Sequence, residues 1–162
     1  MVSPQDVLST LAGAWVLLNS SATNPDGTPV NRTTDTSQGR NGTGTLIYAA
    51  SGYVSAILTP TDPLYRPRNL TYNDFDNTTD AEWAVLGKHN LAYTTPISVQ
   101  VLPEGAADQG IVTHGPIKMA NVPSLEGTNL VRNFTLMEEG RVLRLRIRAS
   151  DGVRSLLYWG RM

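Results

Sequence analysis

Hydrophobic and polar side chains alternate most regularly in the segment VLRLRIR, residues 142–148. Successive side chains of a β-strand point to opposite sides, so this segment predicts a strand with one aliphatic and one basic face. The aliphatic face holds Leu143, Leu145 and Ile147, and the basic face holds Arg144, Arg146 and Arg148. We expect the aliphatic face to lie in the core and the arginines to form a solvated outer stripe.

Similar short apolar segments, separated by turn-forming residues, follow one another along most of the chain. They predict strands at 14–20, 92–102, 110–117, 128–136, 141–149 and 153–162, and a hairpin at 45–60 that turns at AASG. The polar stretches 21–44 and 61–80 are rich in turn formers and predict loops. Consecutive hairpins with little helix favour an antiparallel sheet.

Two helix-start signals interrupt this pattern. Ser3, Pro4 and Asp6 form a capping-box sequence that predicts a short N-terminal helix ending at Gly13. Thr79 and Glu82 form a second capping box ahead of a short helix in 81–90. We therefore predict an all-β fold: an eight-stranded antiparallel up-and-down barrel with a short N-terminal helix and a short helix between strands three and four. A single domain spans residues 1–162, and eight strands enclose an interior wide enough for one small ligand.

The alternation also predicts which side chains face the barrel interior. In 92–102 the inward set is Ile97, Val99 and Val101, with Tyr93 in phase. In two segments the alternation does not decide which set faces the interior. In 110–117 the choice is between Val112 with His114 and Ile111 with Thr113. In 53–58 it is between the set Tyr53, Ser55 and Ile57 and the set Val54, Ala56 and Leu58.

In LVRNFTL the inward set contains a charge, because Arg132 alternates in phase with Leu130, Phe134 and Leu136. An inward guanidinium is costly unless it is paired, hydrogen-bonded or solvated. A polar lumen satisfies that requirement, and so does an aromatic ring at the barrel end.

Charge and composition narrow the classes of function. Thirteen basic and fourteen acidic residues give a formal net charge of −1, which favours neither nucleic acid nor an anionic membrane as partner. The chain has no cysteine, and its two histidines are far apart, so we expect no metal site. The N-terminal stretch does not resemble a signal peptide, and we expect a cytoplasmic protein. A homodimer remains open.

Several motifs, in order along the chain, resemble a known family. GAW at 13–15, GTLIYAASGYVSA at 44–56, VTH at 112–114, LVRNFTL and LLYWGR resemble the lipocalin-like domain family of the calycin superfamily. The resemblance implies a calycin-type barrel in which Trp15 closes the base and Arg161 or Arg132 stacks on it. It also implies a link to natural-product biosynthesis, because members of this family occur beside polyketide and terpenoid biosynthetic enzymes. Some similar small barrels act as cofactor-free cyclases, isomerases or dehydratases.

We expect the catalytic candidates to be His114, Arg132 and Tyr93. An unperturbed imidazole titrates near neutral pH, which suits proton transfer. Arg132 suits a carboxylate, enolate or carbonyl oxygen. The alternatives are a structural His114, and an Arg132 that stacks on Trp15 or pairs with an acid. His89 is expected to cap the second helix or to be solvated.

The substrate-binding candidates are aromatic, because aromatic bodies with polar tips suit ligand pockets as well as barrel cores. They are Trp15, Tyr48, Tyr53, Phe134 and Trp159 in the barrel, and Tyr72 and Trp83 in the segment 61–90, where Tyr65 and Phe75 also lie. That segment is interpreted either as a lid over the barrel mouth or as packing on its wall.

The sequence leaves three functions open, of which one is a partner-binding barrel whose lumen is filled by its own side chains; the other two use a ligand pocket. The first is a cofactor-independent cyclase or isomerase for a hydrophobic, oxygenated polyketide or terpenoid intermediate of secondary metabolism. The second is a non-catalytic carrier that binds a small molecule in the same pocket. Neither requires a cofactor.

Overall fold

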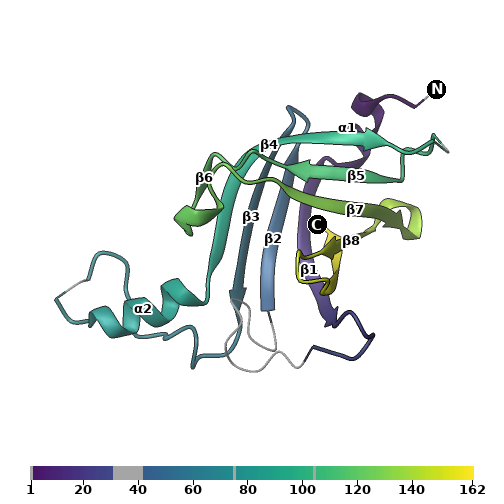
Figure 1. Cartoon of the computed structure of the whole chain (residues 1–162). Helices are drawn as coiled ribbons and strands as arrows, with labels where there is room; N and C mark the ends of the chain where they lie inside the picture. Colours follow the sequence, from purple (N-terminus) through teal and green to yellow (C-terminus); the bar gives the residue numbers. More distant parts are fainter. Residues whose placement is uncertain (1, 31–41, 75, 104) are drawn as a thin grey trace.

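The computed structural model describes residues 2–30, 42–74, 76–103 and 105–162, and their arrangement is drawn in Figure 1. The α-helices of this part are α1 (Pro4–Leu11) and α2 (Asp80–Lys88). The strands are β1 (Gly13–Thr23), β2 (Gly42–Ala49), β3 (Tyr53–Pro60), β4 (Leu91–Val101), β5 (Gln109–His114), β6 (Met119–Ala120), β7 (Leu130–Met137), β8 (Val142–Arg148) and β9 (Arg154–Arg161). Short 3₁₀ turns lie at Pro123–Leu125 and Glu138–Gly140.

Eight of the strands form a closed antiparallel barrel. The sheet runs in the order β3-β2-β1-β9-β8-β7-β5-β4, and β3 pairs with β4 to close it, from Tyr53 opposite Pro96 to Leu58 opposite Leu91. The two-residue β6 pairs with β4 at the edge of this ring. Closure removes the exposed sheet edges and encloses a core.

The predicted strands are present, with some shifted ends. β1 runs to Thr23, three residues past its predicted end, and contains a register shift between Leu17 and Asn19 where it pairs with β9. Such a bulge changes which side of the strand faces inward. β6 was not predicted, because two residues carry no periodicity. The predicted loop 21–44 lies partly outside the described residues.

Burial decides the faces that the sequence left open. Val54, Ala56 and Leu58 point into the barrel, and Tyr53 and Ile57 are about half exposed. Val112 and His114 are fully buried. Leu143 and Leu145 are buried as predicted, and Ile147 packs against the same core. Alternation in these strands therefore places mainly aliphatic and aromatic side chains inside, together with the polar His114.

One end of the barrel is closed by α1. Ser3 caps this helix through the predicted capping box with Asp6, and Val7 and Leu11 are fully buried beneath the barrel. Trp15 is fully buried beside them and donates its indole N–H to the Leu11 carbonyl at 3.0 Å. The guanidinium carbon of Arg161 lies 4.1 Å from the Trp15 ring, so the stacking partner is Arg161 and not Arg132.

The opposite end bears the loops that join β3 to β4 and β8 to β9. In Figure 1, α2 extends to the side of the barrel beyond the ends of these strands. Its predicted capping box, Thr79 with Glu82, is present, and the helix has no buried residue. His89, the C-cap residue, is buried and its ring lies 4.6 Å from that of Tyr65, so it is not solvated.

Among the described residues, no helix has both the length and the apolar character needed to span a bilayer. The same part of the chain holds no group of three or more metal-ligating His, Cys, Asp or Glu side chains.

Candidate functional site

A cavity of about 170 Å³ lies in the barrel lumen, toward the end opposite α1. Most of its wall is aliphatic: Leu46, Ala56, Leu58, Leu91, Leu145, Ile147 and Leu157. The groups that carry polar atoms are Tyr93, His114, Arg132, Ser155 and Trp159. An apolar pocket with a few converging polar groups is the usual form of a small-molecule site.

Three strands bring a tyrosine–histidine–tyrosine chain together at this cavity. The hydroxyl of Tyr48, on β2, lies 2.7 Å from Nε2 of His114, on β5. The hydroxyl of Tyr93, on β4, lies 2.8 Å from Nδ1 of the same ring. All three side chains are buried, so both ring nitrogens of His114 are used in the interior.

The protonation of this chain follows from burial and from a nearby charge. Burial lowers the pKa of His114 well below its usual value, and the positive charge of Arg132 lowers it further. Burial raises the pKa of Tyr48 and, to a lesser degree, so does Tyr93, whereas Arg132 opposes that rise. Burial likewise raises the pKa of Tyr93. At neutral pH the imidazole and both phenols are therefore uncharged.

An uncharged imidazole has one N–H and one acceptor nitrogen, which fixes the direction of the two hydrogen bonds. Neither phenol has another hydrogen-bond partner among the described residues, but Tyr93 lines the cavity and Tyr48 does not. The tautomer in which Tyr48 donates to Nε2 leaves the unpaired hydroxyl proton at the cavity rather than in the closed core, and we infer that tautomer. Nδ1–H of His114 then donates to the Tyr93 oxygen. The Tyr93 hydroxyl proton is left without an acceptor in the described part of the chain, at the wall of the cavity.

Arg132 is the one charged side chain among the described residues that line the cavity. It is half-buried on β7 and makes no hydrogen bond to another described residue. Its charge acts on Tyr48, Tyr93 and His114, which places the guanidinium near the chain. The inward orientation predicted from the alternation of LVRNFTL is confirmed, and the guanidinium remains available to an anionic or carbonyl oxygen.

Trp159 adds a second unused donor. It is buried on β9 and lines the cavity, and its indole N–H has no acceptor among the residues described. A buried donor without a partner costs free energy, and a bound ligand or water is one way to recover it.

A family model described as a lipocalin-like domain matches residues 12–162. The chain belongs to the lipocalin-like domain family. The match covers the whole barrel from the end of α1, and it confirms the resemblance found in the sequence motifs. A lipocalin-like barrel with an internal cavity suggests small-molecule binding.

Two designed proteins are among the solved structures similar to this lipocalin-like barrel. A redesigned β-barrel is 13% identical with a TM-score of 0.42, over 97% of this chain and 96% of that one. A de novo designed fluorescence-activating β-barrel is 9% identical with a TM-score of 0.42, over 97% of this chain and 98% of that one. No curated protein matches the chain.

The lipocalin-like barrel brings some of the predicted site residues together and keeps others apart. His114, Arg132, Tyr93 and Trp159 line the cavity, and Tyr48 lies directly behind His114. Trp15 and Phe134 are buried in the core but do not line this cavity.

The remaining predicted aromatic residues lie outside the lumen. Tyr53 is 51% exposed on the outer wall, and Tyr72 is 88% exposed in the loop before α2. Trp83 lies on α2 and donates its indole N–H to the Thr78 hydroxyl at 2.8 Å. Phe75 lies outside the described residues.

The aliphatic wall and Ser155 were not among the predicted site residues. Ala56 and Leu58 carry no chemical signature, and their inward orientation depended on a choice between two faces of β3. Ser155 lines the cavity because it pairs with Ile147 across β8 and β9, a register that the sequence does not specify.

Proposed function

We propose that this lipocalin-like barrel binds a small, largely apolar molecule whose oxygen atom accepts hydrogen bonds in the lumen. The observation that carries the proposal is the tyrosine–histidine–tyrosine chain, which brings the Tyr93 hydroxyl to a largely aliphatic wall that Arg132 also lines. Neutral donors and one cation suit a carbonyl, enol or carboxylate oxygen. The aliphatic wall suits the rest of the molecule.

The cavity limits the size of the buried part. Its volume of about 170 Å³ is close to that of the roughly 150 Å³ apolar cavities that hold one benzene ring. One ring, or an acyclic group of similar volume, fits beside the hydrogen-bonded Tyr48, His114 and Tyr93. A larger polyketide or terpenoid would bury one portion and extend through the open end.

Matched probes of one size test this proposal. Cyclohexanone and methylcyclohexane have the same number of heavy atoms, and only the ketone can accept a hydrogen bond. Because the hydrocarbon gains more on leaving water, the informative quantity is the ratio of the ketone affinity to the hydrocarbon affinity, measured by saturation-transfer NMR. Tyr93→Phe should lower that ratio roughly tenfold relative to the unchanged chain, the effect of losing one good hydrogen bond.

Tyr158→Phe is the control, because Tyr158 is on β9 next to Trp159 but does not line the cavity. Ala56→Leu fills the lumen and should weaken the binding of both probes equally. The same affinity ratio in the unchanged chain and in Tyr93→Phe would remove the basis for polar recognition.

We propose a second candidate, a cofactor-independent isomerase or cyclase, on the strength of Arg132 beside the Tyr93 hydroxyl. Together these donors can stabilise the enolate oxygen that forms when a solvent water or hydroxide takes the α-proton, and solvent returns a proton to complete an isomerisation. In ring closure the enolate carbon would attack a second carbonyl of the same substrate, whose oxygen takes up the proton. The aliphatic wall would hold the substrate in a folded conformation. With both nitrogens of His114 engaged and its pKa lowered, the imidazole serves to orient Tyr93 rather than to act as a strong base.

Deuterium exchange separates the two candidates. If the site polarises the carbonyl, the α-protons of cyclohexanone in D₂O should exchange faster with the unchanged protein than with the Tyr93→Phe or Arg132→Gln variant. Binding of the ketone without faster exchange supports the carrier and contradicts the enzyme.

A further inference from the structure

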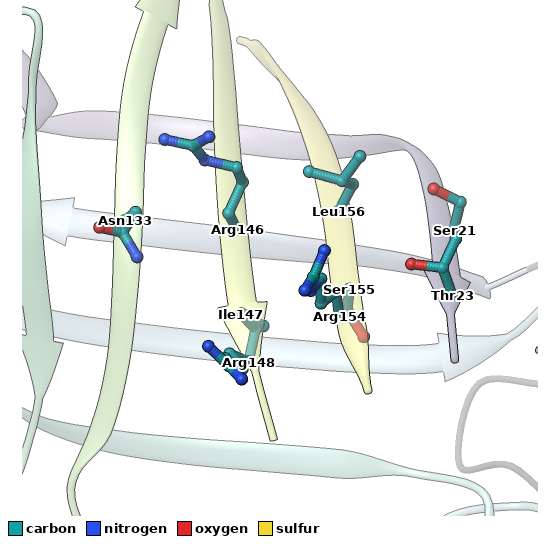
Figure 2. Close-up of a pocket in the computed structure, with 9 residues that line it drawn as sticks. All are labelled: Ser21, Thr23, Asn133, Arg146, Ile147, Arg148, Arg154, Ser155 and Leu156. Atoms are coloured by element: carbon teal, nitrogen blue, oxygen red, sulfur yellow. The ribbon is translucent and has the colours of Figure 1, made fainter. Parts of the chain in front are cut away.

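A second pocket, of about 480 Å³, lies on the outer face of the barrel over β7, β8, β9 and β1. Its lining is strongly basic. Figure 2 shows Arg146, Arg148 and Arg154 on two neighbouring strands, with Asn133 on one flank and Ser21 and Thr23 on the other.

Among the described residues, no acidic side chain pairs with these three arginines. None of them makes an ion pair or a hydrogen bond with another residue of the described part of the chain. Asp26 and Asp151, in the neighbouring turns, accept hydrogen bonds from within their own turns, from Thr28 and Val153. The three guanidinium groups are therefore not held in ion pairs with described residues.

Strand register places this charge in one small area. Arg148 and Arg154 are directly opposite each other in the β8–β9 ladder. Arg146 is two residues from Arg148 on the same face, which corresponds to about 7 Å along the strand, and neighbouring strands are about 5 Å apart. Like charges directly opposite each other destabilise a sheet, so this arrangement has a cost that a bound anion would offset.

The spacing and the chemistry favour a multiply charged oxyanion over a single carboxylate. Three guanidinium groups can surround a phosphate, and each can bind it through two parallel N–H···O hydrogen bonds. The polar flanks offer further donors in Ser21, Thr23 and Asn133. Leu156, opposite Arg146, supplies an apolar floor for the remainder of a ligand.

We propose that this outer pocket binds the phosphate or pyrophosphate group of a small phosphorylated molecule. The pocket is separate from the lumen cavity but adjoins it, because Ile147 and Ser155 line both. The proposal depends on the arginine cluster alone and stands independently of what the lumen binds.

Calorimetric titration with inorganic pyrophosphate tests the proposal. Arg148→Gln/Arg154→Gln removes two charges from the pocket. Lys118→Gln/Arg141→Gln removes two charges from exposed positions outside it and gives the same net charge. We expect the pocket variant to bind pyrophosphate roughly tenfold or more weakly, as loss of charge-assisted hydrogen bonds requires, and the control variant to bind as the unchanged chain does.

The single variants Arg148→Gln and Arg154→Gln should each show an intermediate loss of pyrophosphate affinity if both side chains hold the anion. They also replace the double variant in the titration if that variant does not fold. No binding by the unchanged chain, or equal weakening in both double variants, would overturn the proposal. Phosphatidate vesicles and a single-stranded oligonucleotide form two further arms. Binding of either one that pyrophosphate does not displace would also overturn it, in favour of a membrane or a nucleic acid.

Discussion

His114 has a hydrogen-bond partner on each ring nitrogen and is fully buried, and these two facts decide what it can do. A solvated imidazole near neutral pH exchanges protons freely, but this one is held uncharged by burial and by Arg132. It holds two phenols by hydrogen bonds, and in the proposed function Tyr48 and His114 would position the Tyr93 hydroxyl toward a ligand.

The protonation of His114 gives the barrel a specific pH dependence. In the unfolded chain a histidine binds a proton below about pH 6.5. The buried His114 does not bind that proton, because its folded pKa is lower, so the unfolded state carries more protons. The free energy of unfolding should fall by up to about 1.4 kcal/mol per pH unit as the pH decreases below 6.5.

Urea titrations between pH 8 and pH 5 measure this effect, with His114→Gln as the control. Glutamine does not titrate, so the unfolding free energy of this variant should change less over the same range. Parallel curves for the two chains would contradict the assigned protonation state.

A variant of Tyr48 tests the buried hydrogen bond between Tyr48 and His114. Tyr48→Phe leaves Nε2 of His114 buried without a donor, and should lower the unfolding free energy by about 1–3 kcal/mol. Tyr158→Phe, on the half-buried outer position of β9, should change it by less than about 0.5 kcal/mol. Chemical denaturation of the two variants measures the difference, and equal effects would contradict the proposed role of Tyr48.

At the scale of elements, Arg161 joins the closed end of the barrel to α1. Its guanidinium donates to the Ala12 and Thr10 carbonyls at 2.8 Å and to the Gly140 carbonyl at 2.9 Å, while it lies over Trp15. The last carbonyls of a helix have no partner within the helix, and a cation satisfies them. One side chain of β9 thus connects the N-terminal helix, the β7–β8 turn and the buried indole.

Arg161→Met should therefore weaken the attachment of α1. We expect the unfolding free energy to fall by about 1–3 kcal/mol, a range that allows for the partial exposure of the three hydrogen bonds. Arg68→Met, in the exposed β3–β4 connection, is the matched control and should change little. Hydrogen exchange of the α1 amides should become faster in Arg161→Met alone, and unchanged protection would contradict this role.

At the scale of the whole molecule, the two strands whose pairing closes the barrel, β3 and β4, are separated in sequence by a long connection. β3 and β4 pair over six positions, yet residues 61–90 separate them and α2 buries no residue against the barrel. A segment of this kind contributes little to the core, and it should open locally before the barrel does.

Limited proteolysis measures this difference. Trypsin should cut after Arg68, exposed in the β3–β4 connection, well before it cuts after Arg144 or Arg146 within β8. Arg68→Gln removes that early product in mass spectra. Early cleavage within β8 would show that the ladder is less stable than its pairing indicates.

Local alternation was sufficient to predict the barrel and several of its inner faces. The clean split of residues 142–148 and the phase of Arg132 with Phe134 both persist in the structure, because one strand buries one face. The convergence of Tyr48, Tyr93 and His114 could not be predicted. It requires the register between strands that are up to 66 residues apart in sequence, and no local pattern encodes that register.

The same limit explains the other differences. Both faces of β3 carry apolar side chains, so the outward position of Tyr53 depended on the pairing with β2 and β4. The choice of Arg161 over Arg132 as partner of Trp15 depended on β9 lying beside β1, with Arg161 opposite Trp15.

That pairing of β1 with β9 also determines how the protein can be handled. α1 and the last residue of β9 are at the same end of the barrel, and the lumen cavity lies toward the other end. An affinity tag on α1 or after β9, or attachment to a sensor surface there, should leave the end of the barrel that holds the cavity facing the solution.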